Sequence, residues 1–134
     1  MRREARIAVL KTLYSEEFNN LTSVEMFGNL LKSRKLSNDD REYARRLLEK
    51  TKEMKNEIDS KIKENVKNWS LKRLSKIELN ILRIALAEIE EFPEIPVKVV
   101  IDEAIEIAKI FGSSKSDKFV NGVLDAILKK NGLL

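Results

Sequence analysis

Apolar side chains recur every three or four positions along most of the chain, the spacing that places them on one face of an α-helix. This pattern predicts helices over about residues 3–18, 23–36, 38–54, 76–91, 97–111 and 117–128. From Ile58 to Val66 the spacing continues, and we favour a break near Asn56 and Asp59 that starts a separate helix there. No strand alternation of useful length appears. The sequence therefore predicts an all-α fold of about six or seven helices joined by short links.

Several polar residues mark the ends of these helices. Ser37 stands before two aspartates, as an N-cap residue does. Ser75 and Glu78 have the spacing of a capping box, in which each side chain bonds the free backbone N–H of the other residue. Gly112 is a natural residue for the end of a helix, and residue 116 or 117 is expected to cap the last one.

The helix predicted over residues 76–91 is apolar nearly all round. A helix of this kind is buried nearly all round, so we expect it to be the central helix. Arg83 lies inside this run and is expected to be paired or at a contact edge. Trp69 is expected to anchor the core between two subdomains.

The chain of 134 residues suits one domain, residues 1–134, with approximate subdomains 1–68 and 69–134. It has no Cys and no His, which excludes disulfides, thiol nucleophiles and the usual zinc ligands. It also lacks a glycine-rich phosphate loop, so we expect no enzyme activity, no metal and no cofactor. No apolar run is long enough to span a membrane, and the protein is expected to be cytoplasmic.

The formal net charge of +4 is unevenly distributed. Residues 1–11 are strongly basic, whereas residues 88–106 are strongly acidic. This asymmetry suggests two surfaces for two different partners, and a basic surface permits a nucleic-acid partner. The paired carboxylates Asp102 and Glu106, with Lys109 nearby, are interpreted as a solvated helix face rather than a catalytic or metal site.

Two groups of residues allow both a structural and a functional reading. Arg3, Arg6 and Tyr14 share one side of the first helix, either as a solvated helix start or as an arginine-rich RNA-binding segment. Near residue 116, Phe119 is flanked by Lys115 and Lys118. Its ring either packs sideways or stacks on an unpaired base, and its spacing does not decide between these.

Three motifs extend the interpretation: RREARIAVLKTLY, RLSKIELNILRIALAEI, and IPVKVVIDEAIEIAKIFG followed by SDKFVNGVLD. Through them the chain resembles the NusB family of bacterial transcription antitermination factors over essentially its whole length. The resemblance implies two small helix bundles that share a central helix, and no catalysis. It also implies binding of the boxA element of nascent RNA together with NusE, a ribosomal protein of the small subunit. Such complexes help RNA polymerase to pass terminators, notably on ribosomal RNA operons.

Carried over by position, the resemblance implies RNA-binding residues at Arg2, Arg3, Arg6, Tyr14, Lys115, Ser116, Lys118 and Phe119. It places the NusE contacts on the central helix, where Glu78 and Arg83 are the expected polar residues. The basic start is shorter and has fewer arginines than in many members. Lys115 stands where some relatives have an acidic residue, which adds positive charge. We therefore expect the first helix and the segment around residues 113–116, here called the elbow, to form one RNA-binding face.

Two other functions are compatible with these residues. The chain could be a stand-alone domain related to the NusB-like domain of RNA cytosine methyltransferases, or a structural helical adaptor. No nucleotide-cofactor motif occurs in the chain, which argues against the methyltransferase itself. The oligomeric state stays open, because no long heptad repeat decides between monomer and dimer.

Overall fold

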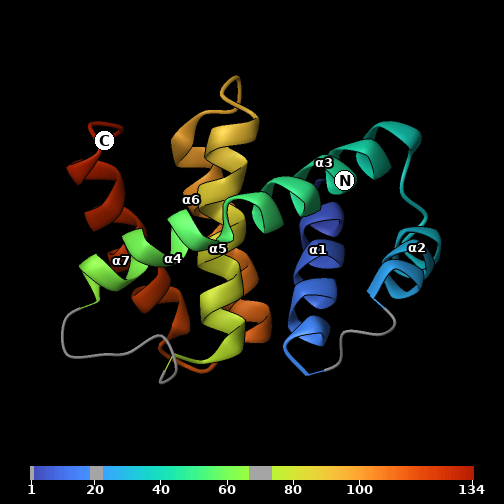
Figure 1. Cartoon of the computed structure of the whole chain (residues 1–134), viewed down its shortest axis with the longest axis horizontal. Coiled ribbons are helices and arrows are strands. Elements are labelled where there is room, and N and C mark those ends of the chain that lie inside the picture. The colour runs from blue at the N-terminus through green and yellow to red at the C-terminus, as the bar shows by residue number, and fades with distance from the viewer. Residues whose placement is uncertain (1, 19–22, 67–73) are drawn as a thin grey trace.

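The structure is a computed structural model that describes residues 2–18, 23–66 and 74–134 (Figure 1). Its helices are α1 (Arg2–Glu16), α2 (Ser23–Ser33), α3 (Asn38–Glu53), α4 (Lys55–Asn65), α5 (Lys76–Glu91), α6 (Val97–Phe111) and α7 (Ser116–Lys130). These ranges contain seven α-helices and no strand, which confirms the all-α prediction.

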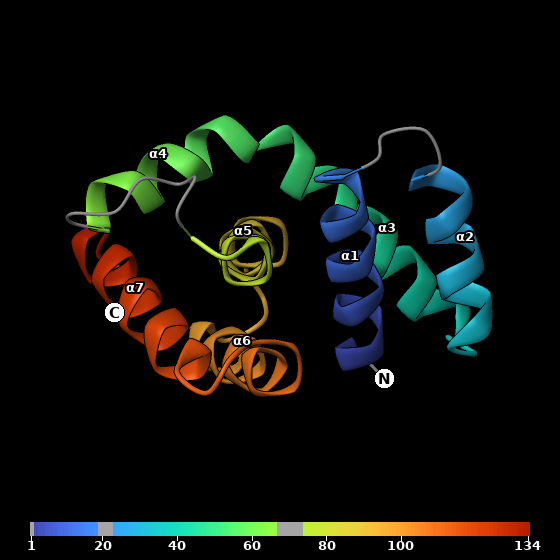
Figure 2. The same cartoon turned by 90° about the horizontal axis from the view of Figure 1, so that it is seen from below.

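Helix α5 is the centre of the fold. Every residue from Leu79 to Glu88 is buried, because neighbouring helices cover all sides of it. Figure 2 looks along α5 and shows α1, α4, α6 and α7 arranged around it, and α3 packs on it as well. The prediction that the helix with apolar residues on nearly all sides is central is confirmed.

Two groups of helices share α5. On one side α1 packs on α2 and α3, and on the other α6 packs on α7, while α4 contacts both α5 and α7. The predicted subdomain boundary at residues 68–69 and the predicted anchor Trp69 lie outside the described residues.

The chain between α3 and α4 breaks earlier than predicted. Helix α3 ends at Glu53, and Met54 leaves helical geometry with φ −92° and ψ 5° before α4 begins. The predicted separate helix is confirmed, but the break before it lies at Met54, about two residues before Asn56. Asp59 is tolerated inside α4 because its carboxylate accepts hydrogen bonds from a side chain of α5 rather than competing for backbone groups.

The predicted N-caps at Ser37 and Ser75 are confirmed. The Ser37 hydroxyl accepts from the backbone N–H of Asp40 at 3.1 Å, and the Ser75 hydroxyl accepts from that of Glu78 at 3.0 Å. The Glu78 side chain, however, points across to α7, so the reciprocal half of the expected capping box is replaced by a tertiary contact.

The end of α6 and the start of α7 differ from the prediction in detail. Lys115 is the N-cap position of α7, so Ser116 is the first helical residue and not the cap. Gly112 does end α6, with φ −90° and ψ −172°. These angles are open to any residue, so glycine is not required there for a left-handed conformation.

Candidate nucleic-acid interface

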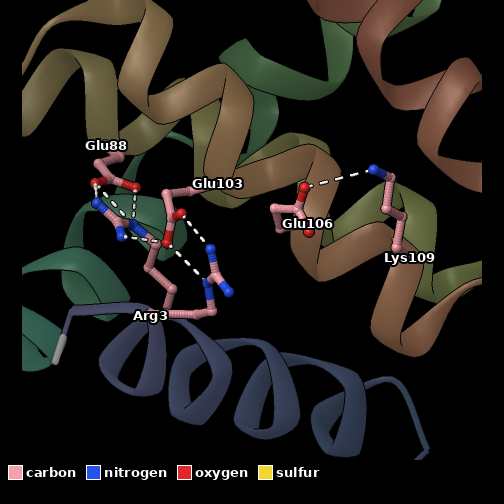
Figure 3. A network of polar contacts seen from close by, with 6 residues as sticks. Arg3, Glu88, Glu103, Glu106 and Lys109 are labelled. Atoms are coloured by element: carbon pink, nitrogen blue, oxygen red, sulfur yellow. Dashed lines mark hydrogen bonds and ion pairs between the residues drawn. The ribbon is translucent and has the colours of Figure 1, made fainter.

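The basic start and the acidic segment of the chain neutralise each other. Arg6 is only 5% exposed and donates from Nε to both carboxylate oxygens of Glu88, at 2.8 and 3.0 Å. Arg3 donates from Nε and Nη2 to Glu103 at 3.1 and 2.7 Å, and Figure 3 shows the two side chains reaching toward each other from α1 and α6. The interpretation of separate basic and acidic surfaces is therefore wrong for these four residues. Buried charges require partners, and α6 and α5 supply them.

The hydroxyl of Tyr43, on α3, also donates to Glu88. Burial, together with the charge of Glu88, raises the pKa of Tyr43 well above its usual value, so the phenol stays protonated and remains a donor. The Tyr43 ring stacks on Phe92 with 4.1 Å between ring centres. The exposed Arg2 guanidinium lies 4.0 Å from the Tyr43 ring centre. Arg2 is thus held at the surface by the ring and stays accessible to solvent.

An aromatic groove of about 580 Å³ lies at the opposite end of α1. It is lined by Leu10, Lys11, Tyr14, Ser15, Phe18, Met26, Ile77 and Phe111. Tyr14 is 38% exposed and meets Phe18 edge to face, with 5.1 Å between ring centres. The Lys11 ammonium lies 5.8 Å from the centre of the Phe111 ring. The groove therefore combines accessible aromatic side chains with a cation.

Sequence reasoning missed Lys11 and Phe111 as members of this groove. Lys11 precedes Tyr14 by one helical turn and Phe111 directly precedes Gly112, so both positions adjoin predicted site residues. Only the packing of α1 beside α6 brings them together. Arg3 contacts Glu103, and eight residues further along both helices Lys11 contacts Phe111. Helices α1 and α6 therefore run parallel to each other.

The elbow lies at the same end of the molecule as the end of α1 and the start of α5 (Figure 1). Lys115 and Lys118 are exposed there, whereas Ser116 is 1% exposed. Phe119 is partly buried and packs against the core. The structure thus places Lys115 and Lys118 at the surface of the elbow and Ser116 inside it.

The predicted RNA-binding residues do not all lie close together. Arg2 and Arg3 begin α1, whereas Tyr14 is near its end, about 18 Å away at 1.5 Å per residue. A single face that contains the basic start, the aromatic groove and the elbow must therefore extend along the whole of α1. An RNA-binding face that extends along the whole of α1 to the elbow remains a prediction.

Both residues expected to contact the protein partner take part in internal contacts. Glu78 is partly exposed and accepts from the Ser116 hydroxyl at 2.8 Å. Arg83 is 6% exposed and donates from Nε and Nη2 to Asp59 at 2.8 and 2.9 Å. Its Nη1 donates to Glu17 at 2.9 Å. Arg83 thereby connects α5 to α4 and to the end of α1, and Glu78 connects α5 to the elbow.

The pairing of Arg3 with Glu103 predicts a loss of stability in acid. The hydrogen bonds and charge of Arg3 lower the pKa of the Glu103 carboxyl in the folded protein. A carboxyl whose pKa is lowered by folding stabilises the protein above its unfolded pKa, and this contribution is lost as pH falls through its folded pKa. We expect the free energy of unfolding to decrease below about pH 4.3, and Glu103→Gln to remove less than about 1 kcal/mol of that decrease.

Urea unfolding at about five pH values between pH 3 and pH 7 measures this effect. Glu106→Gln is the matched control, because the pair of Glu106 with Lys109 on the same helix is long, at 3.4 Å, and exposed (Figure 3). The prediction would be contradicted if the free energy of unfolding of Glu103→Gln changed with pH in the same way as that of the wild type over the whole range.

In the described ranges 2–18, 23–66 and 74–134, no group of three or more acidic, His or Cys side chains is arranged to hold a metal ion. Among the helices described, none is long and apolar enough to cross a bilayer.

Comparison with known proteins identifies the family. The model of the NusB family matches residues 3–129. A transcription antitermination protein NusB from Listeria monocytogenes is 40% identical over 123 residues, which are 92% of each chain. NusB from T. maritima superposes with a TM-score of 0.87 at 41% identity, covering 97% of this chain and 92% of the other.

A further solved structure contains the antitermination factors NusB and NusE in complex with dsRNA. It matches with a TM-score of 0.85 at 31% identity and covers 96% of each chain. The family match over nearly the whole chain agrees with the observed arrangement of helices around α5. This chain belongs to the NusB family.

Proposed function

We propose that this protein is a transcription antitermination factor that binds boxA RNA together with the ribosomal protein NusE, as part of an RNA polymerase antitermination complex. The observation that carries the proposal is the aromatic groove beside the elbow. It offers accessible aromatic rings next to Lys11, with Lys115 and Lys118 exposed at the same end of the molecule. The relative solved with NusE and dsRNA supports both the RNA and the protein partner.

The chemistry of the groove suits unpaired RNA. Single-stranded RNA is recognised by stacking of splayed bases on aromatic side chains and by cations on its phosphates. Tyr14 offers a ring that is 38% exposed, and Lys11 lies one turn before it on α1. Phe119 is available only at the part of its ring that the core leaves uncovered. We therefore assign base stacking first to Tyr14 and phosphate contacts to Lys11, Lys115 and Lys118.

The basic start makes a smaller contribution in this proposal. Arg2 is exposed over Tyr43 and can reach a phosphate directly. Arg3 shares its guanidinium with Glu103, so an RNA phosphate must compete with that carboxylate. Arg6 is paired with Glu88 in the interior, so its role in this proposal is to stabilise the fold beneath the RNA-binding face rather than to contact RNA.

The proposed activity is binding without catalysis. The relatives are named as antitermination proteins, and the groove offers aromatic rings and a cation that suit RNA binding. A factor that acts on bacterial RNA polymerase works in the cytoplasm, which is where we place the protein.

Replacing Tyr14 by Ala is expected to weaken binding of boxA RNA by about 1–3 kcal/mol, the usual value of one stacked base. Lys11→Gln is expected to reduce the dependence of log affinity on log salt by about one phosphate contact. The measurement is an RNA titration with and without NusE at two salt concentrations. Val24→Ala is the matched control, since Val24 is 84% exposed on α2 and is not part of the groove lining.

A scrambled RNA of equal length and composition tests the specific claim. If wild-type protein with NusE binds boxA RNA no more tightly than the scrambled RNA, the proposed function is wrong. If boxA is preferred but Tyr14→Ala binds normally, the assignment of the stacking residue is wrong.

A further inference from the structure

The elbow is held by one buried side chain. Ser113, Ser114 and Lys115 are exposed, whereas Ser116 is 1% exposed. Ser116 was expected to contact RNA, but a side chain so buried cannot meet a ligand at the surface without the elbow opening. Its place in the fold indicates a different task.

The Ser116 hydroxyl uses both its donor and its acceptor capacity. It donates to Oε2 of Glu78 at 2.8 Å and accepts from the backbone N–H of Ser113 at 2.9 Å. The Ser113 hydroxyl lies 3.2 Å from the same atom. The hydroxyl thereby closes the turn from Ser113 to Ser116 and ties that turn to α5.

Glu78 is itself fixed in position. Its backbone N–H donates to the N-cap Ser75, which places Glu78 in the first turn of α5. Its carboxylate reaches Ser116 in the first turn of α7. The N-terminal ends of two helices therefore meet at one negative charge, which both helix dipoles favour.

Gly112 shows how closely the chain packs around Ser116. A Cβ atom added at Gly112 would lie 2.4 Å from the Cβ of Ser116, 2.5 Å from its Oγ and 2.7 Å from the carbonyl oxygen of Ala108. The backbone angles of Gly112 suit any residue, so the need for glycine is a need for space. The elbow is thus built around the Ser116 side chain.

We propose that Ser116 and Glu78 are positioning residues that hold the elbow in its RNA-binding shape and couple it to the start of α5. The proposal rests on the proposed function, since it concerns the same RNA site. The hydrogen bond between Ser116 and Glu78 sets the backbone position of the elbow and thereby the orientation of Lys115 and Lys118, which lie on either side of Ser116. RNA affinity then depends on a hydroxyl and a carboxylate that need not touch RNA.

The contact also provides a route between two partners. Within the described part of the chain, the second carboxylate oxygen of Glu78 accepts no hydrogen bond, and the side chain is partly exposed. A basic side chain of a protein partner docked on the start of α5 can bind that oxygen while Ser116 keeps the other. Binding of such a partner therefore stabilises the elbow, and by linkage RNA stabilises the partner contact.

Titration of boxA RNA against Ser116→Ala, Glu78→Ala and the double variant tests the positioning role. Each single variant is expected to bind about threefold to tenfold more weakly, the usual effect of one hydrogen bond. The double variant is expected to bind no more weakly than the weaker single variant, because both changes remove the same contact. Glu78→Gln keeps an acceptor for the Ser116 hydroxyl and should retain most of the affinity. Ser60→Ala, at an exposed serine of α4 outside the elbow, should bind like the wild type.

Hydrogen exchange of the Ser113 amide gives a readout that does not involve RNA. Its N–H is bonded to the Ser116 hydroxyl, so exchange is expected to accelerate in Ser116→Ala and Glu78→Ala but not in Ser60→Ala. Thermal unfolding confirms that each variant is folded at the assay temperature. If Ser116→Ala does not fold, Glu78→Ala and Glu78→Gln carry the same comparison.

Two results would overturn the proposal. One is that folded Ser116→Ala binds RNA as tightly as the wild type does. The other is that the losses of RNA affinity in the two single variants add fully in the double variant. Failure of the wild type to prefer boxA RNA would instead remove the proposed function. In that case the exchange rate of the Ser113 amide still decides whether Ser116 and Glu78 hold the elbow.

Discussion

Replacing Arg6 by Ala is expected to lower the free energy of unfolding by about 3–5 kcal/mol, the usual cost of removing one partner of a buried ion pair. The side chains of Arg6 and Glu88 are only 6% and 1% exposed. Without Arg6, the Glu88 carboxylate keeps the Tyr43 hydroxyl but loses the positive charge that compensates its burial. For a domain of ordinary stability this loss is a large fraction of the total.

Urea unfolding at neutral pH measures the effect. Arg45→Ala is the matched control, because Arg45 pairs with Glu42 on the surface of α3 with both side chains more than half exposed. That variant should change the stability by less than about 1 kcal/mol. A loss below about 1 kcal/mol for Arg6→Ala would show that the ion pair is not needed to keep Glu88 buried.

The same variant separates the structural role of Arg6 from the RNA-binding role expected from sequence. If Arg6 supports the face from the interior, folded Arg6→Ala at low temperature keeps the salt dependence of RNA binding. If Arg6 contacts a phosphate, the slope of log affinity against log salt decreases by about one contact.

Replacing Arg83 by Ala is expected to lower the free energy of unfolding by about 2–3 kcal/mol, somewhat less than for Arg6 because the acidic partners are less buried. Arg83 binds Asp59 of α4 through two parallel hydrogen bonds and Glu17 through a third. Its removal leaves two carboxylates, 19% and 18% exposed, without their main cation. The connection of α5 to α4 and to the end of α1 is lost at the same time.

Arg83→Lys separates charge from geometry. A lysine ammonium keeps the charge but cannot form the two parallel bonds to Asp59, so we expect a loss between those of the wild type and Arg83→Ala. Stability measured by urea unfolding is compared with binding of NusE at a temperature where all variants are folded. Unchanged stability together with weaker NusE binding would restore the partner-contact interpretation of Arg83.

Local features of the sequence were sufficient for much of the fold. The repeat of apolar residues predicted the helices, and a helix that is apolar on nearly all sides has to be central. The caps at Ser37 and Ser75 depend on residues three positions away, so they could also be predicted. The break before α4 was placed about two residues too late, because the tertiary bond of Asp59 to Arg83 lets that aspartate remain inside α4.

The candidate site was less predictable, because its decisive contacts join residues far apart in the sequence. Arg6 bonds Glu88 across 82 positions, and Ser116 bonds Glu78 across 38. A spacing pattern shows that an arginine or a serine lies on a given helix face, but it does not show which other helix covers that face. Lys11 and Phe111 were overlooked for the same reason, since they meet only where α1 runs beside α6.

By itself, the sequence determined that the protein is all-α, which helix is central, and that it resembles the NusB family, because helical periodicity and ordered motifs are properties of neighbouring residues. The tertiary structure alone decided which charged and polar side chains are free to bind. Arg6, Arg83 and Ser116 are committed to internal partners, whereas Arg2, Lys115 and Lys118 are exposed. The physical reason is that a charge or hydroxyl buried by packing has to be compensated from whichever helix lies opposite, and that neighbour is set by the fold as a whole.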